Sequence, residues 1–278
     1  TKESFEIREA LIDLSLAKGF YDVAISFLIE QASSKGITAE QKSNLMLEVL
    51  DLLYNYDSID NAFDYSLKIS NKLLQNNELL HIKVLTVKAQ YYYSKGQANA
   101  LAKLEQECLN INNPIMTKDV LSMIRFFIAE TELKQPTQEI FSLELKDPLL
   151  ELKNNFSLYN QFKAKLNLVC DTEPTGIYCP KALFTIARRA ESFITLLESI
   201  DIAQTLDDKI VHTFNLEKDR MLEILSADLL KYDEKAYNII QEGTLPQFAD
   251  EILWNYRLDF NFISLQNDTS NGYLQINF

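Results

Sequence analysis

Apolar residues recur along this chain at alternating spacings of three and four, which is the period of a helix that buries one face. The first stripe consists of Ile7, Ala10, Leu11, Leu14 and Ala17. Gly19 ends it, and a second stripe runs from Val23 to the Lys35-Gly36 pair. Similar stripes predict further helices at about 39–56, 58–74, 79–94, 97–109 and 118–133. The connections are only a few residues long, so neighbouring helices are expected to be antiparallel.

The second half continues the helical pattern and then changes period. Pro148 and Pro180 each open a helix, because proline suits a first helical turn, where its missing N–H had no partner. Further helices are predicted from Asp207 onward, at about 233–241 and at about 247–256. Apolar residues then alternate on both sides of a turn-forming stretch at 267–272, which predicts a β-hairpin within 259–278.

The helix pairs of the first third repeat with a step of 38 residues, as positions 16, 54 and 92 illustrate. The recurring sets are Leu11, Val49 and Val87, then Leu16, Tyr54 and Tyr92, then Ala24, Ala62 and Ala100. A small residue in the second helix of each pair lets the two helices cross closely. Tyr92 is then expected to fill the space beside this crossing.

The three pairs also share a spacing in which a turn residue is followed by a small residue five positions later and a large apolar residue four further on. The residues concerned are Gly19, Ala24 and Leu28, then Asp57, Ala62 and Ser66, then Gly96, Ala100 and Leu101. The first set matches fully, the second matches only at the small residue, and the third has its alanine one position early. Through this spacing the chain resembles the tetratricopeptide repeat (TPR) family over about residues 5–114.

The resemblance implies a solenoid of antiparallel helix pairs. The chain departs from the family pattern because no unit has the early Trp and the period is 38 residues rather than the usual ~34. A plain helical bundle with coincidental periodicity is the alternative.

The predicted fold class is therefore all-α, with a TPR-like antiparallel helix-pair solenoid, further helices and a short C-terminal β-hairpin. The predicted segments are 1–116 with the repeats, 117–169 and 170–258 with further helices, and 259–278 with the hairpin. Six Gly and six Pro are too few for a many-turned β-sandwich or barrel, and this scarcity favours long helices.

The formal net charge of −13 narrows the classes of partner. An acidic surface repels phosphate groups, so nucleic-acid binding through a basic face and adsorption to anionic membranes are both disfavoured. No apolar run approaches the ~18–20 residues of a membrane-spanning helix. The partner is thus expected to be a protein or peptide, with no nucleic acid and no membrane-spanning segment.

Three cysteines bear on the compartment. Cys108 lies in a helical apolar pattern and is predicted to be a core residue. Cys170 and Cys179 flank a turn-rich stretch that contains Pro174 and Gly176, so their side chains are able to meet in a disulfide. A disulfide would indicate an oxidising compartment, periplasmic or secreted; two reduced thiols in a cytoplasmic protein are the alternative.

The sequence carries no motif of a nucleotide-binding loop or of a nucleophile elbow. His81 and His212, its only histidines, are interpreted as structural or surface residues, and Asp207-Asp208 as acidic residues at a helix start. No set of four metal ligands is apparent. The sequence predicts a protein that is not an enzyme and that uses no cofactor and no metal.

If the family resemblance holds, positions of the first helix in each pair line a concave groove. These positions are Asp13, Asp51, Asn55, Gln90 and Tyr93. Such a polar, partly acidic groove suits an extended peptide with basic residues. The expected function is a non-catalytic scaffold or adaptor that assists assembly or anchoring of a complex, outside the cytoplasm. A sensor domain that binds a peptide or small ligand, with its output in flanking regions, is the alternative.

Overall fold

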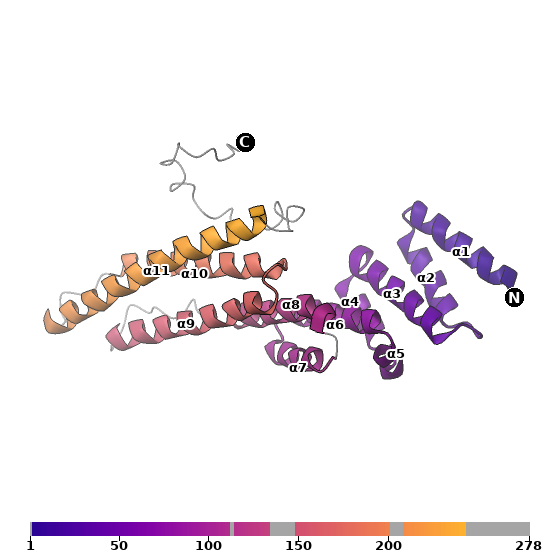
Figure 1. The fold of residues 1–278 in the computed structure, drawn as a ribbon, viewed down its shortest axis with the longest axis horizontal. Helices are drawn as coiled ribbons and strands as arrows, with labels where there is room; N and C mark the ends of the chain where they lie inside the picture. The colour runs from indigo at the N-terminus through magenta and orange to yellow at the C-terminus, as the bar shows by residue number, and fades with distance from the viewer. Residues whose placement is uncertain (1, 112–113, 134–147, 201–207, 243–278) are drawn as a thin grey trace, which may run out of the picture. The chain divides into compact units, whose positions relative to one another are not determined.

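The computed structural model describes residues 2–111, 114–133, 148–200 and 208–242, and every element within these ranges is an α-helix (Figure 1). The all-α prediction is thereby confirmed. The chain divides into two compact units, Thr1–Thr137 and Gln138–Phe278. The predicted hairpin at 259–278 and the predicted helix at 247–256 lie outside the described residues.

The first unit consists of eight described helices joined by short turns. They are α1 (Lys2–Ala17), α2 (Tyr21–Ala32), α3 (Ala39–Tyr56), α4 (Ile59–Ser66), α5 (Asn71–Asn76), α6 (Glu78–Ser94), α7 (Ala98–Leu109) and α8 (Pro114–Leu133). Contacts join α1 to α2, α3 to α4, and α6 to α7. The helix α6 also packs on α3 and α8, so these three helices form a continuous layer.

Two of the turns in this unit have the same geometry. Gly19 and Gly96 adopt positive φ angles of 73° and 66°. The Phe20 N–H donates to the Ser15 carbonyl at 2.8 Å, and the Gln97 N–H donates to the Tyr92 carbonyl, also at 2.8 Å. This six-to-one hydrogen bond after a glycine in the left-handed region is the Schellman motif, which satisfies carbonyls that a helix end would leave unpaired.

Polar side chains cap the N-termini of α3, α4 and α6. The Thr38 hydroxyl accepts from the Gln41 amide at 3.1 Å, and the Gln41 side chain accepts from the Thr38 amide at 2.9 Å, which completes a capping box for α3. Ser58 caps α4, and Asn77 caps α6. These residues supply acceptors for N–H groups of the first helical turn, which have no partner within the helix.

The helix predicted at 58–74 is wrong, because two helices, α4 and α5, occupy this range. The hydroxyl of Ser66 donates to the carbonyl of Phe63 at 2.6 Å. The amides of Lys68 and Ile69 then bond to carbonyls only three residues back, which tightens and ends the helix. Ile69 is buried in this turn, so tertiary packing favours the break.

The small residues predicted to lie at helix crossings are buried in the first two pairs. Ala24 and Ala62 are each 0% exposed. In the third pair Leu101 is fully buried, whereas Ala100 is half-buried. The buried residue therefore lies five positions after the turn residue in all three pairs, and the 38-residue alignment is one position off in the third.

The apolar face predicted for the first helix is exposed. Ile7, Leu11 and Leu14 are 61%, 37% and 56% exposed. Among residues 7–17 of α1, the buried ones are Ile12 and Ser15. The prediction failed because the stripe was assumed to face the core, whereas α1 packs on α2 through its other side.

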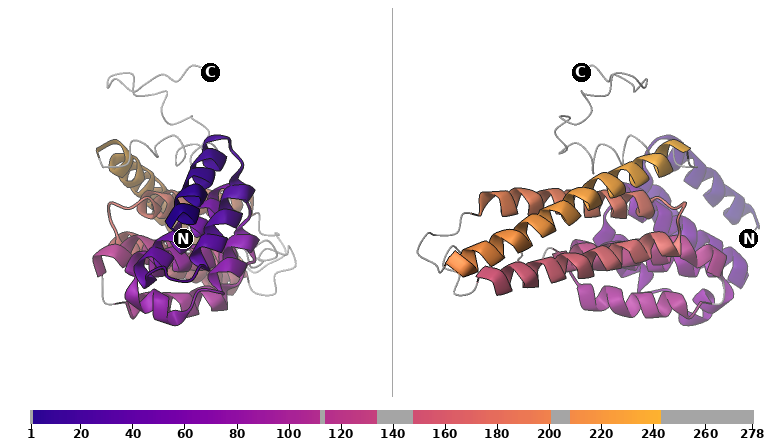
Figure 2. Two further views of the ribbon diagram at one scale, coloured as in Figure 1. Left: turned by 90° about the vertical axis from the view of Figure 1, so that its right-hand side faces the viewer. Right: turned by 60° about the vertical axis from the view of Figure 1, so that its left-hand side comes forward.

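Within residues 148–200 and 208–242 the second unit has three long helices, α9 (Pro148–Thr172), α10 (Tyr178–Ser199) and α11 (Asp208–Glu242), which run alongside one another (Figure 2). Both α9 and α11 pack on α10, and α11 also contacts α9. The predicted separate helix at 233–241 is wrong, because α11 is one continuous helix of 35 residues. The buried stripe of α11 includes Phe214, Met221, Leu225, Tyr232 and Ala236. It continues past residue 233, where a separate helix was predicted to begin.

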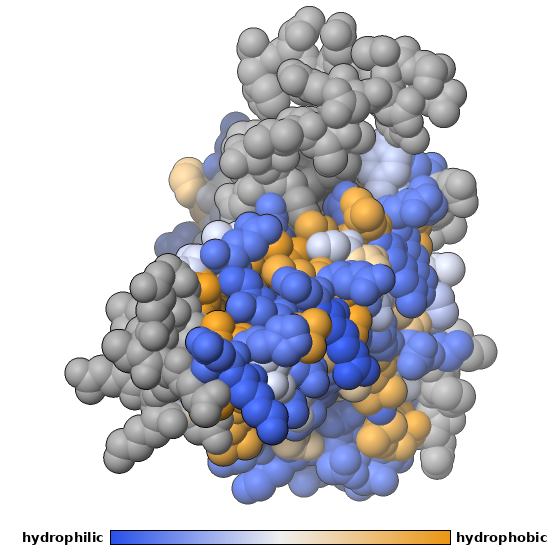
Figure 3. All heavy atoms as spheres, turned by 90° about the vertical axis from the view of Figure 1, so that its left-hand side faces the viewer, coloured by the Kyte–Doolittle hydropathy of each residue, from blue (hydrophilic) through white to orange (hydrophobic). Residues whose placement is uncertain are grey.

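Figure 3 shows the side of the molecule on which α9 and α11 begin. Hydrophilic residues dominate this face, and hydrophobic residues appear in small groups between them.

Candidate functional site

The five predicted groove residues lie on the first helices of the three pairs. Asp13 is on α1, Asp51 and Asn55 are on α3, and Gln90 and Tyr93 are on α6. Asp13 and Asn55 are exposed, and the other three are half-buried. Since α3 packs on α6, the residues of these two helices belong to one layer.

Carboxylates of α1 and α3 come together at Glu48, which the sequence analysis did not single out. Partial burial raises the pKa of Glu48, and the negative charges of Asp13 and then Asp51 raise it further. Two of the predicted groove residues therefore lie close enough to a third acid to repel its charge. This end of the face is an acidic patch, defined by Asp13, Glu48 and Asp51.

A lysine on α6 neutralises part of this patch. The Lys83 ammonium forms an ion pair with the Asp51 carboxylate. The same ammonium lies 4.7 Å from the ring centroid of Tyr54, where a cation is attracted to the aromatic face. Asp51 is thus held by the fold, whereas no cation among the described residues pairs with Asp13 or Glu48.

Gln90 and Tyr93 are also engaged by neighbouring side chains. Gln90 bonds to Tyr54, and its amide nitrogen lies 3.9 Å from the sulfur of Met123 on α8. Tyr93 stacks on Phe127 of α8 with ring centroids 4.2 Å apart. The predicted groove residues at this end therefore contribute to helix packing as well as to the surface.

The three consecutive tyrosines of α6 divide between two neighbours. Tyr91 stacks on Phe63 of α4 at 3.7 Å between centroids, and Tyr92 meets the same ring edge-on at 5.5 Å. Tyr93 points instead to α8. Successive helical residues project about 100° apart, so one aromatic run joins α6 to two different helices.

A polar cluster in the second unit was missed by the sequence analysis. Along α9 a polar residue occurs at every fourth position, and the residues concerned are Asn155, Tyr159, Lys163 and Asn167. The Tyr159 hydroxyl donates to the Asp228 carboxylate of α11 at 2.9 Å, and the Lys163 ammonium pairs with the same oxygen at 2.7 Å. The Asn167 amide donates to the Tyr232 hydroxyl at 3.1 Å. The signal in the sequence is the four-residue spacing of these polar residues beside the apolar stripe of Leu152, Phe162 and Leu166.

The chemistry of this cluster is that of a partly buried ion pair. Asp228 is 9% exposed, and the Tyr159 hydroxyl and the Lys163 ammonium both contact its Oδ2. Burial raises the pKa of Tyr159, and the Asp228 charge raises it further, so the phenol stays protonated as a donor. A donor held in this way orders α9 against α11, and the shift takes the phenol away from the range of acid–base catalysis near neutral pH.

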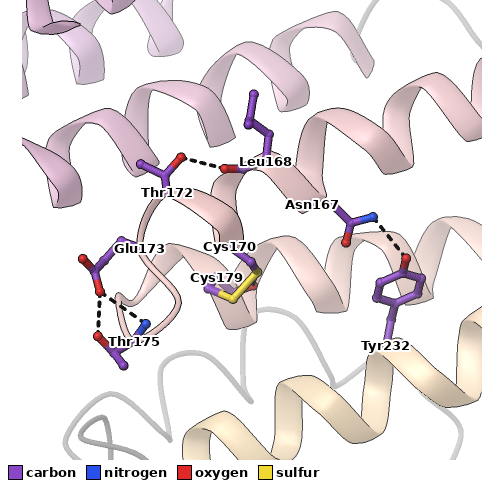
Figure 4. The surroundings of a disulfide bond; sticks show 8 residues. All are labelled: Asn167, Leu168, Cys170, Thr172, Glu173, Thr175, Cys179 and Tyr232. Atoms are coloured by element: carbon purple, nitrogen blue, oxygen red, sulfur yellow. Dashed lines mark hydrogen bonds between the residues drawn. A yellow bond between two sulfur atoms is a disulfide. The ribbon is translucent and has the colours of Figure 1, made fainter.

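A disulfide closes the turn between α9 and α10 (Figure 4). The sulfur atoms of Cys170 and Cys179 are 2.08 Å apart. Inside the turn, the Glu173 carboxylate accepts from the Thr175 hydroxyl at 2.6 Å. Cys108 is a buried free thiol, as predicted, and burial raises its pKa to about 11.

The two histidines lie on different helices. His81 lies 3.4 Å from the Glu107 carboxylate across α6 and α7, and His212 is exposed on α11. Among the described residues no three His, Cys, Asp or Glu side chains gather so as to hold a metal ion. Within the same ranges no helix combines the length and apolar character needed to span a bilayer.

Comparison with protein-family models, with curated proteins and with solved structures finds no match to this chain. The resemblance to tetratricopeptide repeats therefore rests on the residues alone and stays a prediction.

Proposed function

We propose that this protein is a non-catalytic interaction scaffold or adaptor whose first unit is a TPR-like solenoid of helix pairs. The identical glycine turns after α1 and α6 support this proposal, as does the fully buried residue five positions beyond each turn residue. In this role the protein assists the assembly or anchoring of a complex and uses no cofactor.

The first unit binds an extended segment of its partner across α1, α3 and α6. The observation that carries this proposal is the convergence of Asp13 and Asp51 on Glu48. Burial raises the pKa of Glu48, and the negative charges of Asp13 and Asp51 raise it further, so a cation placed beside Glu48 relieves repulsion between these carboxylates. A partner segment with Lys or Arg residues supplies that cation.

The compartment is proposed to be oxidising, either periplasmic or extracellular. The bridge between Cys170 and Cys179 supports this assignment, because structural disulfides are rare where thiol reductants are abundant.

Affinity capture from the native source tests the proposed face. The bait proteins are the wild type, the double reversal Asp13→Lys with Glu48→Lys, and a charge-matched control, Asp64→Lys with Glu223→Lys, at two exposed positions. We expect proteins captured by the wild type and the control to be absent from the double reversal. Identical captured sets for all three baits would overturn the proposal. Asp51 is left unchanged, because replacing it would also strand Lys83.

A further inference from the structure

The outer face of α1 carries a row of exposed apolar residues. The row consists of Ile7, Ala10, Leu11, Leu14 and Ala17, all exposed. Single exposed leucines are common on soluble proteins, but a continuous row on one helix is typical of an interaction surface. Its spacing of three and four matches the seam that one helix presents to another.

The opposite face of α1 is fixed, so this row cannot turn inward. Ile12 is buried on that face. The Arg8 guanidinium donates to the Glu30 carboxylate of α2 at 2.6 Å and to the Ser34 hydroxyl at 2.9 Å. Rotation of α1 about its axis would break both contacts and expose Ile12. The apolar row is therefore a stable feature of the unit.

Acidic residues border the row on one side. Asp13 precedes Leu14 on α1, and Glu48 of α3 lies near enough to Asp13 to feel its charge. A partner that covers the row is thus favoured if it brings positive charge to this border. A second copy of this chain would bring the same border and another net charge of −13, which disfavours self-association.

We propose that the apolar row of α1 docks an amphipathic helix of another protein, whose apolar seam is flanked by lysine or arginine residues. The row spans about 15 Å at 1.5 Å per residue, which suits a partner helix of about three turns. Anchors at helical spacing seat in the row, and the basic flank meets Asp13 and Glu48. This inference rests on the proposed interaction role and adds to it a partner class and an apolar row that shares the Asp13 and Glu48 border.

A synthetic helix tests the proposal with the full chain. The probe is a fluorescent Leu/Lys peptide of about 18 residues with heptad spacing, because shorter helices are marginal in water. A second peptide has the same composition in scrambled order. The proteins are the wild type, Leu11→Gln with Leu14→Gln, and a matched control, Leu67→Gln with Leu79→Gln, which removes two other exposed leucines without a change of charge.

Fluorescence anisotropy should show that the heptad peptide binds the wild type and the control. We expect its affinity for the Leu11/Leu14 variant to fall by about tenfold or more, because two buried leucine contacts are lost. Circular dichroism checks that all three proteins keep their helix content. Equal affinity for all three proteins, or equal binding of the scrambled peptide, would overturn the proposal and leave only charge attraction.

The same variants separate this inference from the proposed function. The Leu11→Gln, Leu14→Gln variant leaves Asp13, Glu48 and Asp51 in place. Affinity capture of a partner segment that binds across α1, α3 and α6 should therefore persist. If the wild type captures its partners but does not bind the heptad peptide, only the proposed docking on the apolar row of α1 is refuted. Sedimentation of the wild type as a dimer that the Leu11/Leu14 variant cannot form would assign the row to a second copy and overturn the partner class.

Discussion

The helices of the first unit run for 6 to 20 residues, whereas the three described helices of the second unit run for 22 to 35 residues. In the first unit, glycine turns and capping side chains set the helix ends. In the second unit, contacts between helices far apart in the sequence set the alignment. Short helices are constrained mainly by where they stop, and long helices mainly by how they register against one another.

The register problem explains the polar cluster between α9 and α11. Apolar stripes on long helices are able to slide past one another by a heptad at little cost in buried area, whereas a buried polar group tolerates only one alignment. Asp228 meets both Tyr159 and Lys163 in the observed alignment alone. In the first unit, ion pairs such as Lys83–Asp51 also join neighbouring helices, and the fully buried Ala24 and Ala62 lie in the second helices of the first two pairs.

The largest expected effect comes from removing the carboxylate of this cluster. Asp228→Ala leaves the buried Tyr159 hydroxyl and the Lys163 ammonium without their acceptor, and should lower the free energy of unfolding by about 3 kcal/mol. Urea unfolding measures the loss, and hydrogen exchange should place it in α9 and α11. Asp219→Ala, at an exposed position of the same helix, is the control. Equal unfolding midpoints for the two variants would show that the cluster does not set the register.

Removal of the disulfide in the second unit should have the next largest effect on stability. It closes a loop of about ten residues, for which the chain-entropy model gives a stabilisation of somewhat under 3 kcal/mol. Cys170→Ser with Cys179→Ser should therefore destabilise the second unit by up to this amount. Alkylation of unreduced, denatured wild type followed by intact-mass measurement should label one thiol, that of Cys108, and three after reduction. Three labelled thiols before reduction would remove the bridge and the argument for an oxidising compartment.

Overpacking a crossing in the first unit should have a smaller effect. Ala62→Leu adds three carbons at a position that is 0% exposed, at a cost of roughly 1–3 kcal/mol. Ala102→Leu makes the same change at an exposed position of α7 and is the control. Chemical denaturation of both proteins measures the difference. A coincidence of their midpoints would mean that α3 and α4 do not need a small residue where they cross.

The smallest expected effect concerns Glu48. Its folded pKa is raised above the unfolded value, so its contribution to stability is fully present at low pH and is lost as the pH rises through the folded pKa. Glu48→Gln removes the repelled charge and should be slightly more stable than the wild type at pH 7. The stabilities of the two proteins should converge as the pH falls below the ordinary range of a glutamate pKa. A wild type that is the more stable at pH 7 would show that a cation already compensates this carboxylate.

Much of the local structure was predictable because it depends on neighbours in the chain. Gly19 and Gly96 mark helix ends through a backbone conformation that favours glycine. Pro148 opens α9, where its missing N–H had no partner. Cys170 and Cys179 were able to meet because the turn between them is short. The 38-residue step predicted which helices carry the five groove residues. It did not predict the contacts of these residues with Lys83, Met123 and Phe127.

The all-α class, most helix boundaries and the buried positions of Ala24 and Ala62 follow from the order of the amino acids, since helical period and turn chemistry are local properties. Which side of α1 is buried depends on its neighbours in space, because an apolar stripe does not say whether a neighbour exists to cover it. Packing also brings Asp228 to Tyr159 and Lys163, residues 69 and 65 positions away. Ion pairs join residues that lie far apart in the sequence and that only helix packing brings together. The periodicity of one helix therefore does not identify the residue with which its charges pair.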